Sequence, residues 1–180
     1  IEKEYNIYTD KNIRNEGYKV NFISDLHFGT TMSNNELQKY CDNISQRNVD
    51  IVILGGDIVD ENTTLKQMKD AFKILSSIKS NYGIVYVYGN HDKSRYAINP
   101  NYTEEELKEA ISECRIKILE DDIYEINNEL CIIGRKDRSD SEERKSAQDL
   151  VSEFNKDYYT IIVDHQPCEI NENSENGYDL

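Results

Sequence analysis

The sequence predicts an α/β fold built around a largely parallel sheet. Five short apolar runs, rich in β-branched and aromatic residues, are spaced along the chain at Val20–Ile23, Ile51–Leu54, Ile84–Tyr88, Leu130–Ile133 and Tyr159–Val163. Several runs are continuous rather than alternating, as expected for strands that are covered on both faces. Segments with helical spacing separate the first runs, and such alternation of strand and helix is typical of a parallel sheet.

Four helices are predicted. Three carry apolar stripes, within residues 37–44, 65–78 and 107–114, in which apolar residues recur three and four positions apart, and a fourth, weakly amphipathic and strongly charged, is expected at about 141–154. Ser33 and Glu36 form a capping box before the first of them. Thr103 and Glu106 form another before the third. Tyr5–Tyr8 is predicted to add an N-terminal strand, whereas the polar last ten residues carry no predicted closing element.

Length and charge narrow the classes of function. The chain has 180 residues, with 21 Lys and Arg against 35 Asp and Glu, which gives a net charge of −14. This length predicts one domain over residues 1–180. The acidic balance argues against nucleic-acid binding through bulk positive charge. No run approaches the roughly 20 apolar residues of a membrane helix, so no membrane contact is expected from this segment.

Metal-binding residue types follow four of the predicted strands. The four clusters are Asp25-Leu26-His27, Gly56-Asp57-Ile58-Val59-Asp60, Gly89-Asn90-His91-Asp92 and Asp164-His165-Gln166-Pro167. Because the carboxyl ends of parallel strands meet at one edge of a sheet, the clusters should converge there. Carboxylate, imidazole and amide groups together suit Mn, Fe or Zn rather than Ca.

All three histidines of the chain, His27, His91 and His165, lie directly after a strand and next to another ligand-type residue. A single histidine in such a place is more often structural, since polar side chains are common at strand ends. Three of them together with Asp25 and Asp57 indicate a metal site. If the backbone is extended, Asp25 and His27 point the same way.

The order and spacing of these motifs resemble the calcineurin-like metallophosphoesterase superfamily, over about residues 18–167. The resemblance implies a four-layer α/β/β/α sandwich. It also implies an enzyme that hydrolyses a phosphomonoester, phosphodiester or pyrophosphate bond through two divalent ions, with a metal-bound water as nucleophile. A small phosphorylated substrate is then the expected partner. The alternative class is a non-catalytic scaffold or binding module that keeps the fold, and metal analysis discriminates the two.

Transferred residue by residue, the resemblance gives each motif a role. It implies that one ion is held by Asp25 and His27, that the other is held by Asn90 and His165, and that Asp57 bridges both. His91 resembles the catalytic histidine that protonates the leaving oxygen. Asp60 resembles the carboxylate that orients this histidine.

The family closes its site with a Gly-His-x-His segment, and no histidine follows His165 here. We therefore expect the C-terminal part of the domain to be missing from this chain, which by itself would then bind metal weakly or be inactive. Arg135 and Arg138 are candidates for contacts with the substrate phosphate. The alternative is that they are solvated loop residues, as exposed Arg side chains usually are. Tyr96 and Tyr102 are interpreted as surface or cap packing rather than as residues that stack on a substrate.

The start at Ile1, together with the N-terminal run, resembles a bacterial branch of the family that carries an N-terminal membrane segment. Ordinary trimming of a domain gives the same start. The location therefore stays open between the cytoplasm and the soluble domain of a membrane-anchored bacterial protein, and the oligomeric state is open too.

Overall fold

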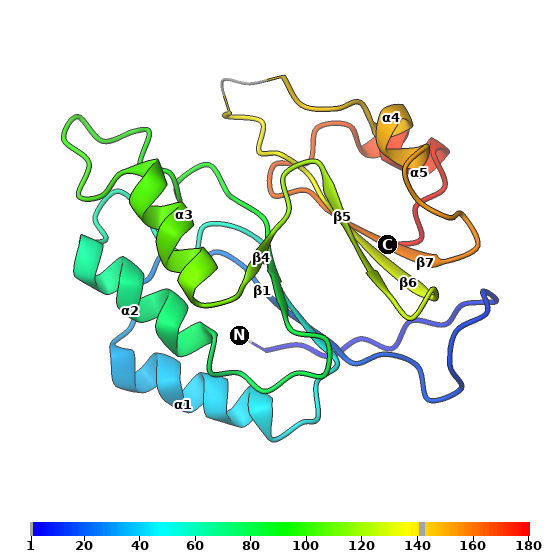
Figure 1. Ribbon diagram of the computed structural model, residues 1–180, viewed down its shortest axis with the longest axis horizontal. Coiled ribbons are helices and arrows are strands. Elements are labelled where there is room, and N and C mark those ends of the chain that lie inside the picture. Colours follow the sequence, from blue (N-terminus) through cyan, green and yellow to red (C-terminus); the bar gives the residue numbers. More distant parts are fainter. Residues whose placement is uncertain (1, 141–142) are drawn as a thin grey trace.

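The first half of the chain forms a four-stranded parallel sheet in the order β1-β2-β3-β4 (Figure 1). The computed structural model describes residues 2–140 and 143–180. The strands of this first sheet are β1 (Val20–Ile23), β2 (Ile51–Leu54), β3 (Ile84–Tyr86) and β4 (Lys117–Ile118). The connecting helices are α1 (Asn34–Ser45), α2 (Leu65–Leu75) and α3 (Glu104–Glu113).

The second half forms a three-stranded sheet in the order β5-β6-β7. Its strands are β5 (Asp122–Ile126), β6 (Leu130–Gly134) and β7 (Tyr159–Val163). β5 and β6 are antiparallel, whereas β6 and β7 are parallel and joined by a connection that contains α4 (Ala147–Val151). After β7 the chain forms the short helix α5 (Ile170–Glu175), and the last residues then hydrogen-bond to the β7 backbone at Thr160 and Ile162.

Three apolar clusters explain how these parts are stacked. The largest lies between the first sheet and α1–α3. The second joins the two sheets face to face, with Ile53 and Val85 from one sheet packed against Ile132 and Ile161 from the other. The third lies on the outer face of the second sheet, where Leu150 of α4 meets β6. Helices, first sheet, second sheet and α4 thus follow one another across the molecule (Figure 1).

The continuous apolar pattern of β2 follows from this stacking. All four residues of β2 are buried. Ile51 and Ile53 face the second sheet, whereas Val52 and Leu54 face the helices. Because both faces are covered, an alternating pattern would have placed polar groups in a core. The prediction of an α/β fold with a parallel sheet is confirmed.

Several predicted boundaries are corrected. Residues 5–8 form no strand, because no strand among the described residues pairs with them. Tyr5 and Tyr8 are exposed by 74% and 92%. β3 ends at Tyr86, and the fourth helix is shortened to α4. The first part of that predicted helix, residues 141–142, lies outside the described residues. In the part of the chain that the structure describes, no helix has the length and apolar character needed to cross a membrane.

Candidate metal centre

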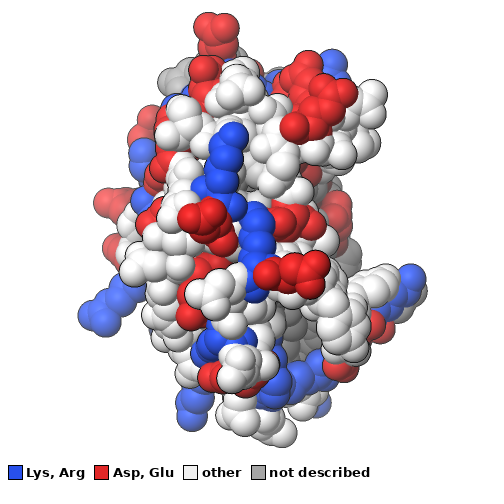
Figure 2. All heavy atoms as spheres, turned by 90° about the vertical axis from the view of Figure 1, so that its right-hand side faces the viewer, with Lys and Arg blue, Asp and Glu red and all other residues white. Residues whose placement is uncertain are grey.

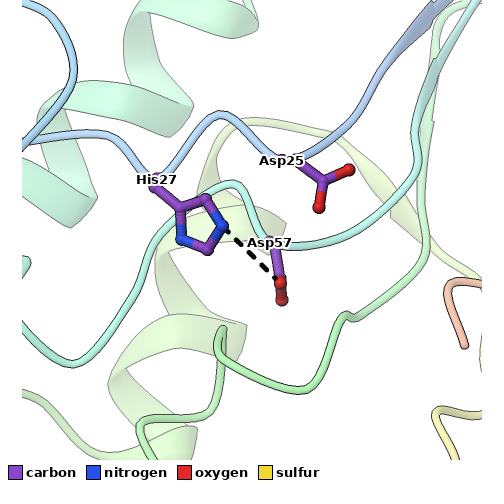
Figure 3. A group of neighbouring side chains, drawn as sticks. All are labelled: Asp25, His27 and Asp57. Atoms are coloured by element: carbon purple, nitrogen blue, oxygen red, sulfur yellow. Dashed lines mark ion pairs between the residues drawn. The ribbon is translucent and has the colours of Figure 1, made fainter.

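Three ligand-type side chains converge at the carboxyl ends of β1 and β2. Ligand atoms of Asp25, His27 and Asp57 lie within 4.8 Å of one another. Figure 3 shows the three side chains around one space, with Nε2 of His27 3.8 Å from Oδ2 of Asp57. Two carboxylates and an imidazole that share one space form a donor set suited to a divalent transition ion.

The backbone at these three residues is left-handed rather than extended. The φ angles are 54° at Asp25, 43° at His27 and 51° at Asp57, values that residues with a Cβ seldom adopt. Hydrogen bonds to the loop after β2 hold Asp25 and His27 in this conformation, because the Asp25 N–H donates to Gly56 O at 3.0 Å and the His27 N–H to Asp57 O at 2.9 Å. The expectation that an extended backbone aligns Asp25 and His27 is wrong, and paired loops bring the two side chains together instead. Such backbone strain is characteristic of functional sites.

Two glycines make room for these side chains. A Cβ on Gly89 would lie 2.2 Å from Oδ1 of Asp57, and one on Gly56 would lie 2.5 Å from Nδ1 of His165. Gly56 also has a φ of 95°, which favours glycine. Both positions therefore require glycine if Asp57 and His165 are to keep their places.

Asp92 ties the loop after β2 to the loop after β3. Its side chain is fully buried and accepts four backbone N–H groups, at distances of 2.6–3.1 Å, from Asp57, Ile58, Val59 and Gly89. Burial raises the pKa of Asp92 to about 6, against the opposing effect of the N–H donors. The sequence motif contains this residue, but sequence reasoning gave it no role.

His165 reaches the site from β7 in the second sheet. Its Nε2 lies 3.2 Å from Oδ2 of Asp57, and its Nδ1–H donates to Gly55 O at 2.9 Å. Burial lowers the pKa of His165, but the contacts with Asp57 and with the carbonyl outweigh burial and raise it to about 9. Burial acts in the opposite direction on Asp57 and would raise its pKa, yet the hydrogen bonds from His165 and from the His91 N–H hold this pKa below its usual value. The shifted pKa values of His165 and Asp57 therefore both favour a protonated imidazole beside an ionised carboxylate when no metal is present.

His91 lies beside this group, and its carboxylate partner differs from the expected one. Nδ1 of His91 is 2.9 Å from Oε2 of Glu61, so Glu61 rather than Asp60 orients the ring. Burial alone would lower the pKa of His91, but the Glu61 hydrogen bond and nearby carboxylates outweigh it and raise this pKa. Sequence reasoning missed Glu61, although it directly follows the second motif. Asn90 precedes His91 in the same loop and is half-buried.

Asp60 faces the other histidine. Its Oδ2 lies 3.3 Å from Nδ1 of His27, and its Oδ1 accepts the Asn62 N–H at 2.8 Å. Its backbone N–H donates to the Thr63 hydroxyl at 3.0 Å. The structure therefore makes Asp60 a partner of His27, and the expected pairing with His91 is wrong. A carboxylate on Nδ1 of a histidine leaves Nε2 free to bind metal.

Of the two arginines considered as substrate contacts, Arg135 is excluded by its burial. Its side chain is fully buried, where it meets Glu169 at 3.0 Å and donates to Lys145 O at 2.7 Å. Arg138 is exposed, and it lines a shallow hollow of about 530 Å³ together with Gln166 and Pro167. Its role toward a substrate stays a prediction.

The surface charge of one face is mixed. Lys and Arg side chains lie interspersed among Asp and Glu on the side of the molecule turned toward the viewer in Figure 2. This face therefore carries charge of both signs. Close to His165 in the sequence, Arg144 and Asp164 form an ion pair, with Nη2 and Oδ2 2.6 Å apart.

Comparison with known proteins agrees with this geometry. A family model described as calcineurin-like phosphoesterase matches residues 18–180. The chain belongs to this family. Membership in the metallophosphoesterases implies a hydrolase that uses divalent metals, and the group of Asp25, His27 and Asp57 is suited to hold them.

Three relatives illustrate the range of the family. An uncharacterized metallophosphoesterase of Helicobacter pylori is 34% identical over 90 residues, which cover 50% of this chain and 23% of the relative. One from Aquifex aeolicus is 28% identical over 172 residues, or 93% of this chain and 62% of the relative. The DNA double-strand break repair protein Mre11 of Nanoarchaeum equitans is 34% identical over 82 residues, which cover 39% of this chain and 23% of the relative. The match thus spans about a quarter of the Helicobacter protein.

Proposed function

We propose that this chain carries the catalytic centre of a metal-dependent phosphoesterase, which hydrolyses a phosphomonoester, phosphodiester or pyrophosphate bond. The observation that best supports this is the approach of His27 and His165, from two different sheets, to one carboxylate. Their Nε2 atoms lie 3.8 Å and 3.2 Å from Oδ2 of Asp57. A buried carboxylate that faces two imidazoles offers donor types that a divalent transition ion binds.

The proposed ligand sets follow the motifs. One ion would be held by Asp25 and His27, the other by Asn90 and His165, with Asp57 between the two. Carboxylate, imidazole and amide donors favour Mn, Fe or Zn. When bound, the two ions supply the positive charge that attracts the phosphate and stabilises the charge of the transition state. This local charge offsets the net charge of −14.

His91 is the proposed general acid. Since Glu61 occupies Nδ1, Nε2 is the ring nitrogen that faces a substrate. During hydrolysis a water oxygen bonds to phosphorus and gives up a proton to solvent, while the bond from phosphorus to the leaving oxygen breaks. The leaving oxygen keeps the electron pair and takes the proton of Nε2. Burial would lower the pKa of His91, but the Glu61 hydrogen bond and nearby carboxylates outweigh burial and raise this pKa, which favours the protonated ring that a general acid needs.

The stacking of layers supports the same assignment. Helices, two facing sheets and α4 follow one another in the order that the four-layer α/β/β/α sandwich requires. We propose that this stacking is the four-layer sandwich of the family. A small phosphorylated substrate is the partner that we propose.

The test combines hydrolysis with metal analysis. The protein is assayed with p-nitrophenyl phosphate and bis(p-nitrophenyl) phosphate in Mn²⁺, and bound metal is measured by mass spectrometry. Asp57→Asn should abolish hydrolysis and reduce bound metal, because it removes the charge shared by both histidines. Asp157→Asn makes the same change at an exposed position and should alter neither quantity.

Two results would refute the proposal. Full hydrolysis by the Asp57→Asn variant would show that the centre is not catalytic. A protein that takes up no transition metal at micromolar concentrations would favour the alternative of a non-catalytic scaffold.

A further inference from the structure

The loop between β3 and α3 reverses the usual distribution of polar and apolar side chains. Tyr96 and Ile98 are exposed by 59% and 98%. In the same loop the side chains of Lys93 and Arg95 are exposed by only 6% and 26%. Charged side chains are normally the exposed ones, so uncovered apolar side chains beside the nearly buried side chain of Lys93 point to a binding surface.

Both ends of this loop are held in place. Lys93 is surrounded by three carboxylates within 2.8 Å, those of Glu104, Glu120 and Asp140. Arg95 donates to Ser139 O at 2.9 Å. At the other end the Tyr102 hydroxyl donates to Asp92 O at 2.9 Å. The loop therefore presents Tyr96 from a fixed position, and Tyr102 is structural, as expected.

Tyr96 lies directly against the proposed general acid. Its ring centroid is 5.2 Å from that of His91, with an interplanar angle of 56°. The His91 ring is in turn 5.6 Å from the ring of His27. An exposed aromatic ring thus borders the candidate centre on the side of His91.

We propose that Tyr96 binds the leaving group of the substrate, and that this group is aromatic or otherwise planar. The proposal rests on the function proposed above. A general acid donates its proton to the leaving oxygen, so the leaving group must lie next to His91. Tyr96 is an exposed ring that borders His91, and a planar group can stack on it. The proposal gives Tyr96 a role beyond the expected surface packing.

The test compares two phosphate esters across variants of the metal-loaded protein. The esters are 1-naphthyl phosphate, with a planar leaving group, and glycerol 2-phosphate, with a polar one; the matching methyl diesters serve if the protein cleaves only diesters. Tyr96→Ala should lower the ratio of their kcat/KM values roughly threefold to tenfold, as expected for the loss of one aromatic contact. Tyr96→Phe keeps the ring and should keep the ratio. Tyr8→Ala is the matched control, because Tyr8 is also exposed and lies far from Tyr96 in the sequence.

Inhibition by products gives a second readout. The inhibition constant of 1-naphthol should rise in Tyr96→Ala, while that of inorganic phosphate stays unchanged. If the wild type hydrolyses these esters but both measurements are the same in Tyr96→Ala, the inference is wrong and the proposed function stands. If the wild type cleaves neither a phosphate ester nor a pyrophosphate bond, the proposed function is wrong, and this inference is overturned with it.

Discussion

Oδ2 of Asp92 accepts the backbone N–H of Asp57 at 2.7 Å, so a buried carboxylate fixes the central residue of the candidate centre from behind. The same oxygen accepts the Gly89 N–H at 2.6 Å, from the loop that carries Asn90 and His91. One side chain therefore sets the spacing of two ligand loops. Precise placement of this kind is what a site for two ions needs.

Asp92→Ala should destabilise the fold strongly. The substitution leaves four buried N–H groups without an acceptor, and each such group costs about 1–3 kcal/mol. We expect the free energy of unfolding, measured by urea denaturation, to fall by at least about 3 kcal/mol. The exposed Asp157→Ala should change it little. A loss below about 1 kcal/mol in Asp92→Ala would show that water or rearrangement satisfies these groups.

The metal-free protein should lose stability as the pH rises from about 6.5 to 9. The folded pKa of His165 is about 9, above the roughly 6.5 of an unfolded histidine. The stabilisation is therefore complete below pH ~6.5 and is lost as the pH rises through 9. Urea unfolding with a chelator should show a decrease on the order of 2–3 kcal/mol. His165→Asn should flatten this dependence of stability on pH. If the variant lost as much stability over this pH range as the wild type, the dependence would come from another group.

Metal binding should displace the same proton. A metal ligand must be deprotonated, so Mn²⁺ binding at pH 7 should release a proton from His165. Calorimetry in two buffers with different ionisation enthalpies measures this release. Apparent affinity should rise with pH, by up to about tenfold per unit below pH 9. Binding that is independent of pH would mean that His165 stays protonated and is no ligand.

Glu61→Gln should shift the pH dependence of hydrolysis more than Asp60→Asn does, because Glu61 hydrogen-bonds His91 whereas Asp60 acts on it only through its charge. The Glu61 carboxylate raises the pKa of His91, and a general acid loses activity as the pH rises through its pKa. With a neutral amide at position 61 this pKa falls, so the alkaline limb of the kcat/KM profile moves to lower pH. The opposite result, a shift in Asp60→Asn alone, would restore Asp60 as the partner of His91.

Gly89→Ala should abolish metal binding. The new Cβ would lie 2.2 Å from Oδ1 and 2.5 Å from the backbone N of Asp57, and neither atom can withdraw without moving the ligand loop. Gly83→Ala is the control, because its φ of 84° is strained but no atom lies within 4 Å. We expect that control to lose about 1 kcal/mol of stability and to keep its metal. Normal metal content in Gly89→Ala would contradict the close approach.

Local signals explain which elements could be predicted. The bounds of β1, β2 and β7 agree with the predicted runs because these strands are apolar and end at turn residues. The starts of α1 and α3 agree because each carries a capping box, at Ser33 and Thr103. β4 could not be predicted, since it has two residues and neither is buried.

Partner choice within the site could not be predicted. Asp60 and Glu61 are adjacent carboxylates, and only the path of the loop decides that Asp60 reaches His27 while Glu61 reaches His91. Burial of Arg135 depends on Glu169, 34 residues further along the chain, which lies beside α5. Spacing along the sequence identifies groups of candidate residues, whereas contacts between distant segments assign their individual roles.

The bond between His165 and Gly55 O spans 110 residues. During translation the segment that holds Asp25, His27 and Asp57 leaves the ribosome well before β7 has been synthesised. Until then the apolar face of β2 and β3 has no second sheet to cover it, and a nascent chain in that condition is a natural client for chaperones. His165 joins its partners only after the two sheets have docked. An ion that uses His165 as a ligand is therefore captured only after β7 has been synthesised and the two sheets have docked.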